Sequence, residues 1–254
     1  MNYQDLITAC QQDWNCYTQH NFVTQLAAGT LPHQAYLHYL KQDFLFLKHY
    51  ARAYALAIYK ADNLADMKQT LPGLQALIEH EMDHHVSYCG QWGLTASTME
   101  DEPEDVGTVA YTRYVLETGL SGDLIDLFVA LAPCAIGYAE IGEHLMSSPT
   151  TNKTHNPYLS WIELYGGADF QQGGSKSRQR LNDQLKDIAL DSPKGQRLCQ
   201  IFKTATRMEV GFWQQALESI ILRANTHAVG SNIPTNLFSY SVNICLLRLH
   251  PLLH

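Results

Sequence analysis

Apolar residues recur at helical spacing from the start of the chain to about residue 221, whereas the strict alternation typical of strands is scarce. Alanine, leucine, glutamine and glutamate, which favour helices, are plentiful. The segment from Gly167 to Arg180 fits either a loop or a loosely started helix. With no internal repeat and no linker, the pattern predicts one all-α domain, a single helical bundle over residues 1–221. Its helices are expected near residues 3–16, 18–28, 33–62, 65–91, 105–118, 122–147, 156–164, 170–190 and 194–222.

The end of the chain has a different composition. From Ser219 to His254 there is no acidic residue, although the whole sequence has 25. The character shifts from helical to rich in Thr, Asn and Ser, and then to LLRLHPLLH. A docking tail, a loosely packed extension and a segment unrelated to the domain's function all fit this composition. We therefore separate residues 222–254 as an atypical tail whose structure the sequence leaves open.

Composition and charge narrow the class of protein. The 254-residue chain is 46% hydrophobic and 17% charged, so it has the apolar surface that a disordered chain lacks. Its net charge of −8 argues against a nucleic-acid partner, because phosphate contacts need clustered Lys and Arg. The most apolar uncharged run, Leu127–Ala139, has 13 residues and is too short to span a bilayer. With no leader-like N-terminus and no CxxC among six cysteines, we expect a cytoplasmic protein with reduced thiols and no membrane partner.

Three predicted helices carry a reactive side chain on an apolar face. Asp43 shares a helix face with Tyr39 and Phe46, and Glu209 interrupts the apolar stripe of the last helix. Cys134 lies in the most apolar helix, directly after a proline that should bend it. Each residue alone has a structural explanation, since thiols pack as small hydrophobes and buried carboxylates are often hydrogen-bonded by Tyr or Arg. Together they indicate a site, because buried carboxylates are costly and are retained mainly where they have a task.

Two metal-binding alternatives compete with this site. His80-Glu81-Met82-Asp83-His84 matches HExxH, which would place two imidazoles on one helix face with Glu81 as general base. The extended form of the motif fails, because Ser87 stands where it requires glycine. A di-iron bundle would combine Glu81 and His84 with Glu140-x-x-Glu143-His144, but the second motif has Glu143 where a His is needed. Both are weak signals.

Five motifs, in order and at the right spacing, resemble the TenA/thiaminase II family from near residue 1 to about residue 221. GTLPHQAYLHYLKQDFLFL resembles the family's GTL…QD helix. EHEMDHH resembles its E.E...H segment, which makes the HExxH match a coincidence. AYTRYVLETGLSGDLIDLFVALAPCAIGYAEIGEHL is similar to its long SG…ALLPC…Y.E.G stretch, and IELYGG and MEVGFW are similar to its two late motifs.

The resemblance implies a haem-oxygenase-like helical bundle around a pocket for a pyrimidine. Members hydrolyse the bond between the pyrimidine methylene and an amine or a thiazolium. In thiamin salvage they convert aminomethylpyrimidine, and often thiamin itself, to hydroxymethylpyrimidine. Cys134, at the family's PC position, implies the Cys type. The resemblance further implies a homo-oligomer, either a tetramer or a dimer, with no cofactor and no metal.

Residue roles follow from the same resemblance. Cys134 is expected to be the nucleophile and Glu209 the proton donor to the ring, as an addition to an electron-poor ring requires. Asp43 is expected to hydrogen-bond the ring's amino group and adjacent nitrogen. The other expected pocket residues are aromatic: Tyr111, Tyr138, Tyr165, Phe212 and Phe46.

Phe46 departs from a well-known form of the family, which has a tyrosine at this position. Without that hydroxyl, activation of the thiol falls to Asp43, Tyr111 or water. Two other function classes stay open from the sequence. One is a helical pyrimidine-binding or regulatory protein without turnover, which Phe46 favours, and the other is a metal-dependent helical enzyme.

Overall fold

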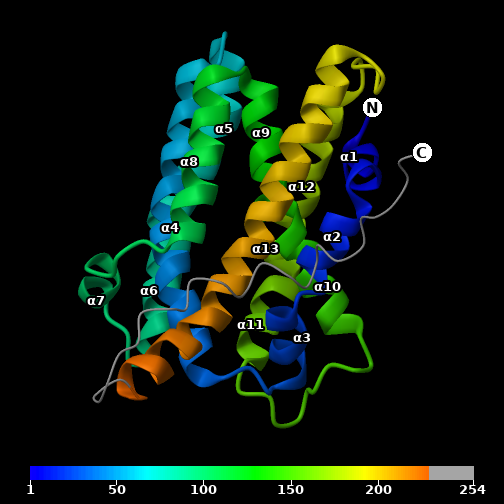
Figure 1. Cartoon of the computed structure of the whole chain (residues 1–254). Coiled ribbons are helices and arrows are strands. Elements are labelled where there is room, and N and C mark those ends of the chain that lie inside the picture. The colour runs from blue at the N-terminus through cyan, green and yellow to red at the C-terminus, as the bar shows by residue number, and fades with distance from the viewer. Residues whose placement is uncertain (229–254) are drawn as a thin grey trace.

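The computed structural model describes the backbone of residues 1–228 and the side chains of residues 1–219. All regular elements in this range are helices, which confirms the all-α prediction (Figure 1). In chain order they are α1 (Tyr3–Ala9), α2 (Gln11–Thr18), α3 (Asn21–Ala28), α4 (His33–Lys60), α5 (Leu64–Ala76), η1 (Leu77–Glu81), α6 (Met82–Gly90), α7 (Ala96–Glu100), α8 (Val106–Ser121), α9 (Leu124–Ala132), η2 (Pro133–Gly137), α10 (Tyr138–Ser147), α11 (Leu159–Gly166), α12 (Ala168–Leu185) and α13 (Pro193–Ala228).

The helices differ from the predicted ones in a few places. The predicted helix 3–16 divides at Cys10, whose φ of −137° and ψ of 35° are not helical. Helix α7 lies in a stretch for which no helix was expected. The undecided segment after Gly167 is helical from Ala168 onward. Helix α13 continues six residues past the expected end, and the rest of the separate tail, residues 229–254, lies outside the described residues.

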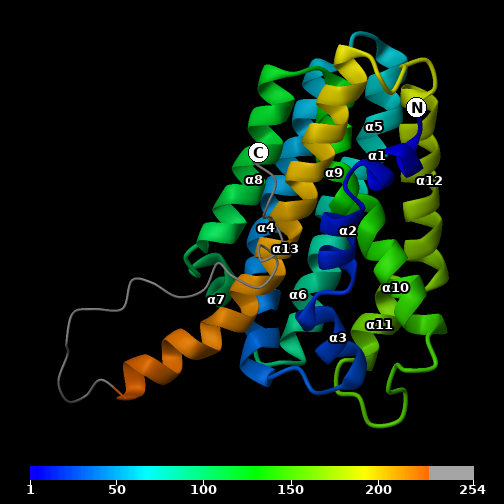
Figure 2. The same ribbon diagram turned by 45° about the vertical axis from the view of Figure 1, so that its right-hand side comes forward.

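Helix α13 is the central element of the bundle. It contacts α1, α2, α3, α4, α8 and α9. Figures 1 and 2 show the long helices α4, α8, α12 and α13 running along the bundle, with the short helices α1 to α3 packed beside them. A side chain on the inner face of α13 therefore meets several helices at once.

An aromatic cluster fixes the helices relative to one another. Trp213 of α13 is fully buried and stacks on Phe22 of α3 with ring centroids 4.7 Å apart. The same indole lies 5.4 Å from the ring of Tyr39 on α4 and 5.2 Å from that of Tyr138 on α10. Large apolar surfaces removed from water in this way hold together the three helices that carry Asp43, Glu209 and Tyr138.

Two π-helical turns, η1 and η2, interrupt otherwise continuous helices. Turn η2 begins at Pro133, which lacks an N–H and clashes with the carbonyl four residues earlier, so the helical ladder must adjust there. The disturbance that the sequence predicts at Pro133 thus takes the form of a wider turn, and this turn contains Cys134. Turn η1 contains Glu81 and has no proline, and nothing in its sequence explains it. Single π-turns are frequent at functional sites.

A buried ion cluster ties α9 to the start of α13. Asp126 is only 2% exposed. Its carboxylate lies 2.9 Å from Nζ of Lys194 and 3.3 Å from a guanidinium nitrogen of Arg197. It also accepts the backbone N–H of Asp123 in the capping box that starts α9. This buried carboxylate is fully paired.

Within the part of the chain that the structure describes, a single stretch, Leu124–Ser147, is long and apolar enough to cross a membrane by length and composition. Its most apolar window has a mean hydropathy of 1.7, and 67% of that window is buried inside the bundle. The stretch comprises α9, η2 and α10, which pack against α11, α12 and α13. It is a core element of the helical domain.

Candidate active site

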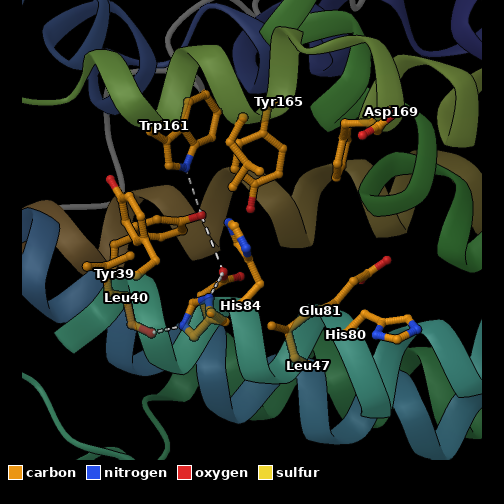
Figure 3. A pocket seen from close by; sticks show the side chains of 14 residues that line it. Tyr39, Leu40, Leu47, His80, Glu81, His84, Trp161, Tyr165 and Asp169 are labelled. Atoms are coloured by element: carbon orange, nitrogen blue, oxygen red, sulfur yellow. Dashed lines mark hydrogen bonds and ion pairs between the residues drawn. The ribbon is translucent and has the colours of Figure 1, made fainter. Parts of the chain in front are cut away.

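A cavity of about 350 Å³ opens between α4, η1 and α6 on one side and α11 and α12 on the other (Figure 3). Asp43 and Tyr165 are the two predicted site residues on its wall. The wall also holds Glu81, His84 and Asp169. Figure 3 shows side chains from both groups of helices pointing into the space between them. The cavity is large enough for a small heterocycle.

Asp43 on α4 is buried, and one side of its carboxylate is held by neighbours. The Tyr39 hydroxyl donates to Oδ2 at 3.4 Å and itself accepts the Trp161 indole N–H at 3.2 Å. His85 Nδ1 lies 3.6 Å from the same oxygen, while its Nε2 faces the Leu40 carbonyl at 3.0 Å. Burial raises the pKa of Asp43, against the lowering effects of His85 and Tyr39. All these contacts are to Oδ2, so Oδ1 is left for a ligand.

Glu209 on α13 is 1% exposed and has one hydrogen bond, from the Tyr111 hydroxyl to Oε1 at 2.9 Å. No Lys, Arg or His of the described residues forms an ion pair with it. Burial raises the pKa of Glu209 from 4.5 to about 8, although the bond from Tyr111 lowers it and the charge of Asp43 raises it further. At neutral pH this carboxyl holds its proton and can donate it.

Cys134 in η2 is a free, partly buried thiol. Burial raises its pKa well above the ordinary value, and the negative charges of Glu209, Asp43 and Glu81 raise it further. The thiol is therefore coupled electrostatically to three carboxylates, two of which are on the cavity wall. It is protonated at neutral pH, so it must lose its proton as it reacts.

The remaining predicted residues form an aromatic layer beside these groups. The ring of Phe46 lies 5.1 Å from Tyr111 and 5.7 Å from Phe212. The rings of Tyr138 and Tyr165 are 5.3 Å apart. The structure thus brings together all eight predicted residues, but only two of them line the open cavity.

A glycine sets the position of Tyr165. Helices α10 and α11 approach so closely that a Cβ on Gly142 would lie 2.4 Å from the carbonyl carbon of Tyr165. Any side chain at Gly142 would push α11 away, since the obstacle is backbone. Tyr165 is held by this contact at the end of α11, with its side chain in the cavity (Figure 3).

Several wall residues were not expected from the sequence. Glu81 and His84 belonged to a motif dismissed as a chance HExxH match, and Asp169 lay in the segment whose structure was undecided. The polar run EHEMDHH was the available signal for the first two. Nothing in the local sequence distinguishes Asp169 from other exposed acids.

The metal alternatives find little support in the geometry. Among the described residues, no group of three or more His, Cys, Asp or Glu side chains is arranged to hold a metal ion. His80, Glu81 and His84 all line the cavity without forming such a group. Glu140, from the proposed di-iron motif, is instead paired with Arg178 at 2.7 Å.

Comparison with known proteins identifies the class. The sequence profile of the TENA/THI-4/PQQC family matches residues 7–219, so the chain belongs to that family. A solved chain from Silicibacter, described as a TenA family transcription regulator, is 42% identical with a TM-score of 0.79, covering 85% of this chain and 96% of its own. The aminopyrimidine aminohydrolase of Halalkalibacterium halodurans is 34% identical over 211 residues, 83% of this chain and 93% of the relative.

The fold extends to more distant proteins. A domain of unknown function with a heme oxygenase-like fold, from Shewanella denitrificans, has a TM-score of 0.64 at 13% identity, over 88% of this chain and 95% of its own. At that identity the likeness shows the fold alone. The chain is therefore an all-helical, haem-oxygenase-like member of the TENA/THI-4/PQQC family, as the sequence motifs predicted.

Proposed function

We propose that this protein is an aminopyrimidine aminohydrolase, which converts aminomethylpyrimidine, and thiamin as well, to hydroxymethylpyrimidine. The observation that carries the proposal is a buried, proton-holding carboxyl, Glu209, near the Cys134 thiol and beside a cavity that exposes Asp43. The family membership and the aminohydrolase relative from Halalkalibacterium halodurans support the same reaction class.

The chemistry needs a nucleophile and an acid that act together. As the sulfur of Cys134 bonds to a ring carbon, Glu209 donates its proton to a ring nitrogen, and the thiol proton passes to the Glu209 carboxylate. The ring, no longer aromatic, expels the ammonium group as a neutral amine with the electrons of the C–N bond. Water then adds to the exposed methylene, and the carbon–sulfur bond breaks to restore the aromatic ring and the thiol.

Orientation is the proposed task of the remaining residues. Asp43 has Oδ1 free to accept from the ring amino group, while Tyr39 holds Oδ2. Tyr165 and Tyr138 supply aromatic surface for a flat ring, and Phe46, Tyr111 and Phe212 close the side next to Glu209. Phe46 has no hydroxyl to assist the thiol, and we assign the proton of Cys134 to the Glu209 carboxylate, the first of the charges coupled to it, in place of Asp43, Tyr111 or water.

The test is turnover with matched cysteine variants. Wild type, Cys134→Ser and Cys199→Ser are incubated with aminomethylpyrimidine and with thiamin, and hydroxymethylpyrimidine is measured. Cys199 is also a free, partly buried thiol, but it lies on α13 away from the cavity, so its variant should match wild type. We expect Cys134→Ser to lose at least ~10³-fold in kcat. Equal rates for Cys134→Ser and wild type would refute the enzyme, and binding without turnover would establish the regulatory alternative. Loss of wild-type activity on chelation would favour the metal-dependent class.

A further inference from the structure

The cavity wall has a pronounced charge asymmetry. Of its fourteen lining residues, three are carboxylates, namely Asp43, Glu81 and Asp169, and none is Lys or Arg. Five others are aromatic, and three are histidines. Carboxylates and aromatic faces are the groups that stabilise organic cations. The lining therefore favours a ligand that carries positive charge.

Glu81, like Asp169, is an acid of the cavity wall without a partner among the described residues. Within the described residues its carboxylate forms no hydrogen bond and no ion pair, whereas Glu104 and Glu140 are each bound by an arginine at 2.6 and 2.7 Å. Figure 3 shows the Glu81 side chain extending from η1 into the opening of the cavity. Glu81 is exposed as a whole residue, and partial desolvation of its carboxyl at the cavity wall, and then the charge of Asp43, raise its pKa. An unpaired carboxylate in this position is open to a cationic ligand.

Glu81 is also coupled electrostatically to the reacting thiol. Its charge contributes to the raised pKa of Cys134, as does that of Asp43, whereas Asp169 contributes nothing to it. Both Glu81 and Cys134 are placed by π-turns, which interrupt two separate helices on the two sides of the site. Glu81 lines the same cavity as Asp43, so a ring held by Asp43 in this cavity has Glu81 on the wall around it.

We propose that Glu81 binds the cationic group on the pyrimidine methylene and then accepts a proton from the water that replaces it. This inference rests on the proposed function. The ammonium pairs with the Glu81 carboxylate and leaves as neutral amine when the C–N bond breaks. Water adds its oxygen to the methylene and gives one proton to Glu81, which passes it to the departing amine. The sum is one water consumed, one alcohol formed and one ammonium released.

The binding test separates charge recognition from ring recognition. Affinities for aminomethylpyrimidine, which is cationic at pH 7, and for the neutral hydroxymethylpyrimidine are measured by calorimetry in a Cys134→Ser background that prevents turnover. Adding Glu81→Gln should lower the affinity for the cationic ligand at least tenfold and the affinity for the neutral ligand less than twofold. Glu79→Gln is the matched control, because Glu79 lies on the same π-turn but not on the cavity wall. It should leave both affinities within twofold.

The kinetic test addresses the proton step. With Cys134 intact, Glu81→Gln should lower kcat at least a hundredfold, and Glu81→Asp should recover part of the loss. An unchanged ratio of the two affinities in Glu81→Gln overturns the recognition role, and an unchanged kcat overturns the proton-accepting role. Both results would leave the proposed function intact if wild type still turns over. Failure of the Cys134→Ser protein to bind either pyrimidine would overturn the proposed function and this inference together.

Discussion

Two carboxylates are buried to the same degree in this bundle, and their surroundings are opposite. Asp126, 2% exposed, is paired with Lys194 and Arg197. Glu209, 1% exposed, has a single hydrogen bond from Tyr111 and no cation among the described residues. The first arrangement cancels a buried charge and fastens α9 to α13. The second leaves a carboxyl that holds its proton near neutral pH.

The comparison shows that burial of an acid does not by itself identify chemistry. What matters is whether the fold supplies a counter-charge. A paired acid stabilises the structure and is inert, whereas an acid with only a neutral donor is available for proton transfer. Substitutions at the two acids and at Phe46 would test this distinction.

Glu209→Gln should lower kcat by about 10²- to 10⁴-fold, the range typical for loss of a general acid. The amide keeps the shape of the side chain and can still accept the Tyr111 hydrogen bond, so folding should be unaffected. The measurement is steady-state turnover of aminomethylpyrimidine beside thermal unfolding. If Glu209→Gln unfolded more easily than wild type but kept its kcat, Glu209 would have the structural role that we assign to Asp126.

Asp126→Ala should have the opposite profile. Removing the buried carboxylate leaves Arg197 without its partner and Lys194 with Asp123 alone, and costs about 3 kcal/mol in the free energy of unfolding. Lys194 and Arg197 are partly exposed, at 32% and 53%, so water relieves some of the loss. Denaturant titration measures the stability, and kcat per folded molecule should stay within about threefold, since Asp126 contacts no proposed site residue.

The raised pKa of Glu209 also predicts a pH dependence. Between pH 4.5, where the carboxyl of an unfolded chain ionises, and about pH 8, the folded state retains a proton that the unfolded state has lost. Wild type should therefore lose stability as pH rises, by up to ~1.4 kcal/mol per pH unit, relative to Glu209→Gln. Denaturant titrations of both proteins from pH 5 to 9 measure this difference.

Loss of the Glu209 proton should also limit activity at high pH. In wild type, kcat/KM should fall above about pH 8, as Glu209 loses the proton that it donates to the ring. If the free energy of unfolding changed with pH in the same way for wild type and Glu209→Gln, the carboxyl of Glu209 would ionise at its ordinary pKa. The contrast drawn between Glu209 and Asp126 would then be wrong.

Phe46→Tyr should have the smallest effect. The added hydroxyl would lie in the layer of Tyr111 and Phe212, next to the tyrosine that donates to Glu209. We expect kcat to rise less than about tenfold, because a second polar group assists removal of the thiol proton. Phe46→Leu serves as the control for packing alone. A fall in kcat for the tyrosine variant alone would indicate that the apolar surface of Phe46 is what the site requires.

Much of the fold could be predicted from the sequence, because amphipathic periodicity determines helices directly. An acidic residue within an apolar helix face correctly predicted that Glu209 and Asp43 lie in the interior. The same signal is present at Asp126 in LIDLFVALA, and no local pattern separates the two kinds of acid. Only the packing of the start of α13 against α9 brings Lys194 and Arg197 to one of them.

The cavity wall was much less predictable. No signal in the sequence predicts turn η1. This wider turn carries Glu81, whose side chain lies at the opening of the cavity. Asp169 reaches the wall because α12 begins directly after Gly167, at a segment whose periodicity is obscured by glycines. Positions set by a π-turn or by close helix packing depend on contacts distant in sequence, so single-sequence patterns do not specify them.

The position of hydroxymethylpyrimidine in a crystal structure of the complex is the decisive measurement for the roles of Cys134, Glu209 and Asp43. We expect the ring in the cavity beside α4, on the side toward η2 and α13, with its amino group on Asp43, a ring nitrogen within hydrogen-bond distance of Glu209 and a ring carbon facing the sulfur of Cys134. A ring bound elsewhere, or one separated from Cys134 and Glu209 by intact protein, would contradict the account.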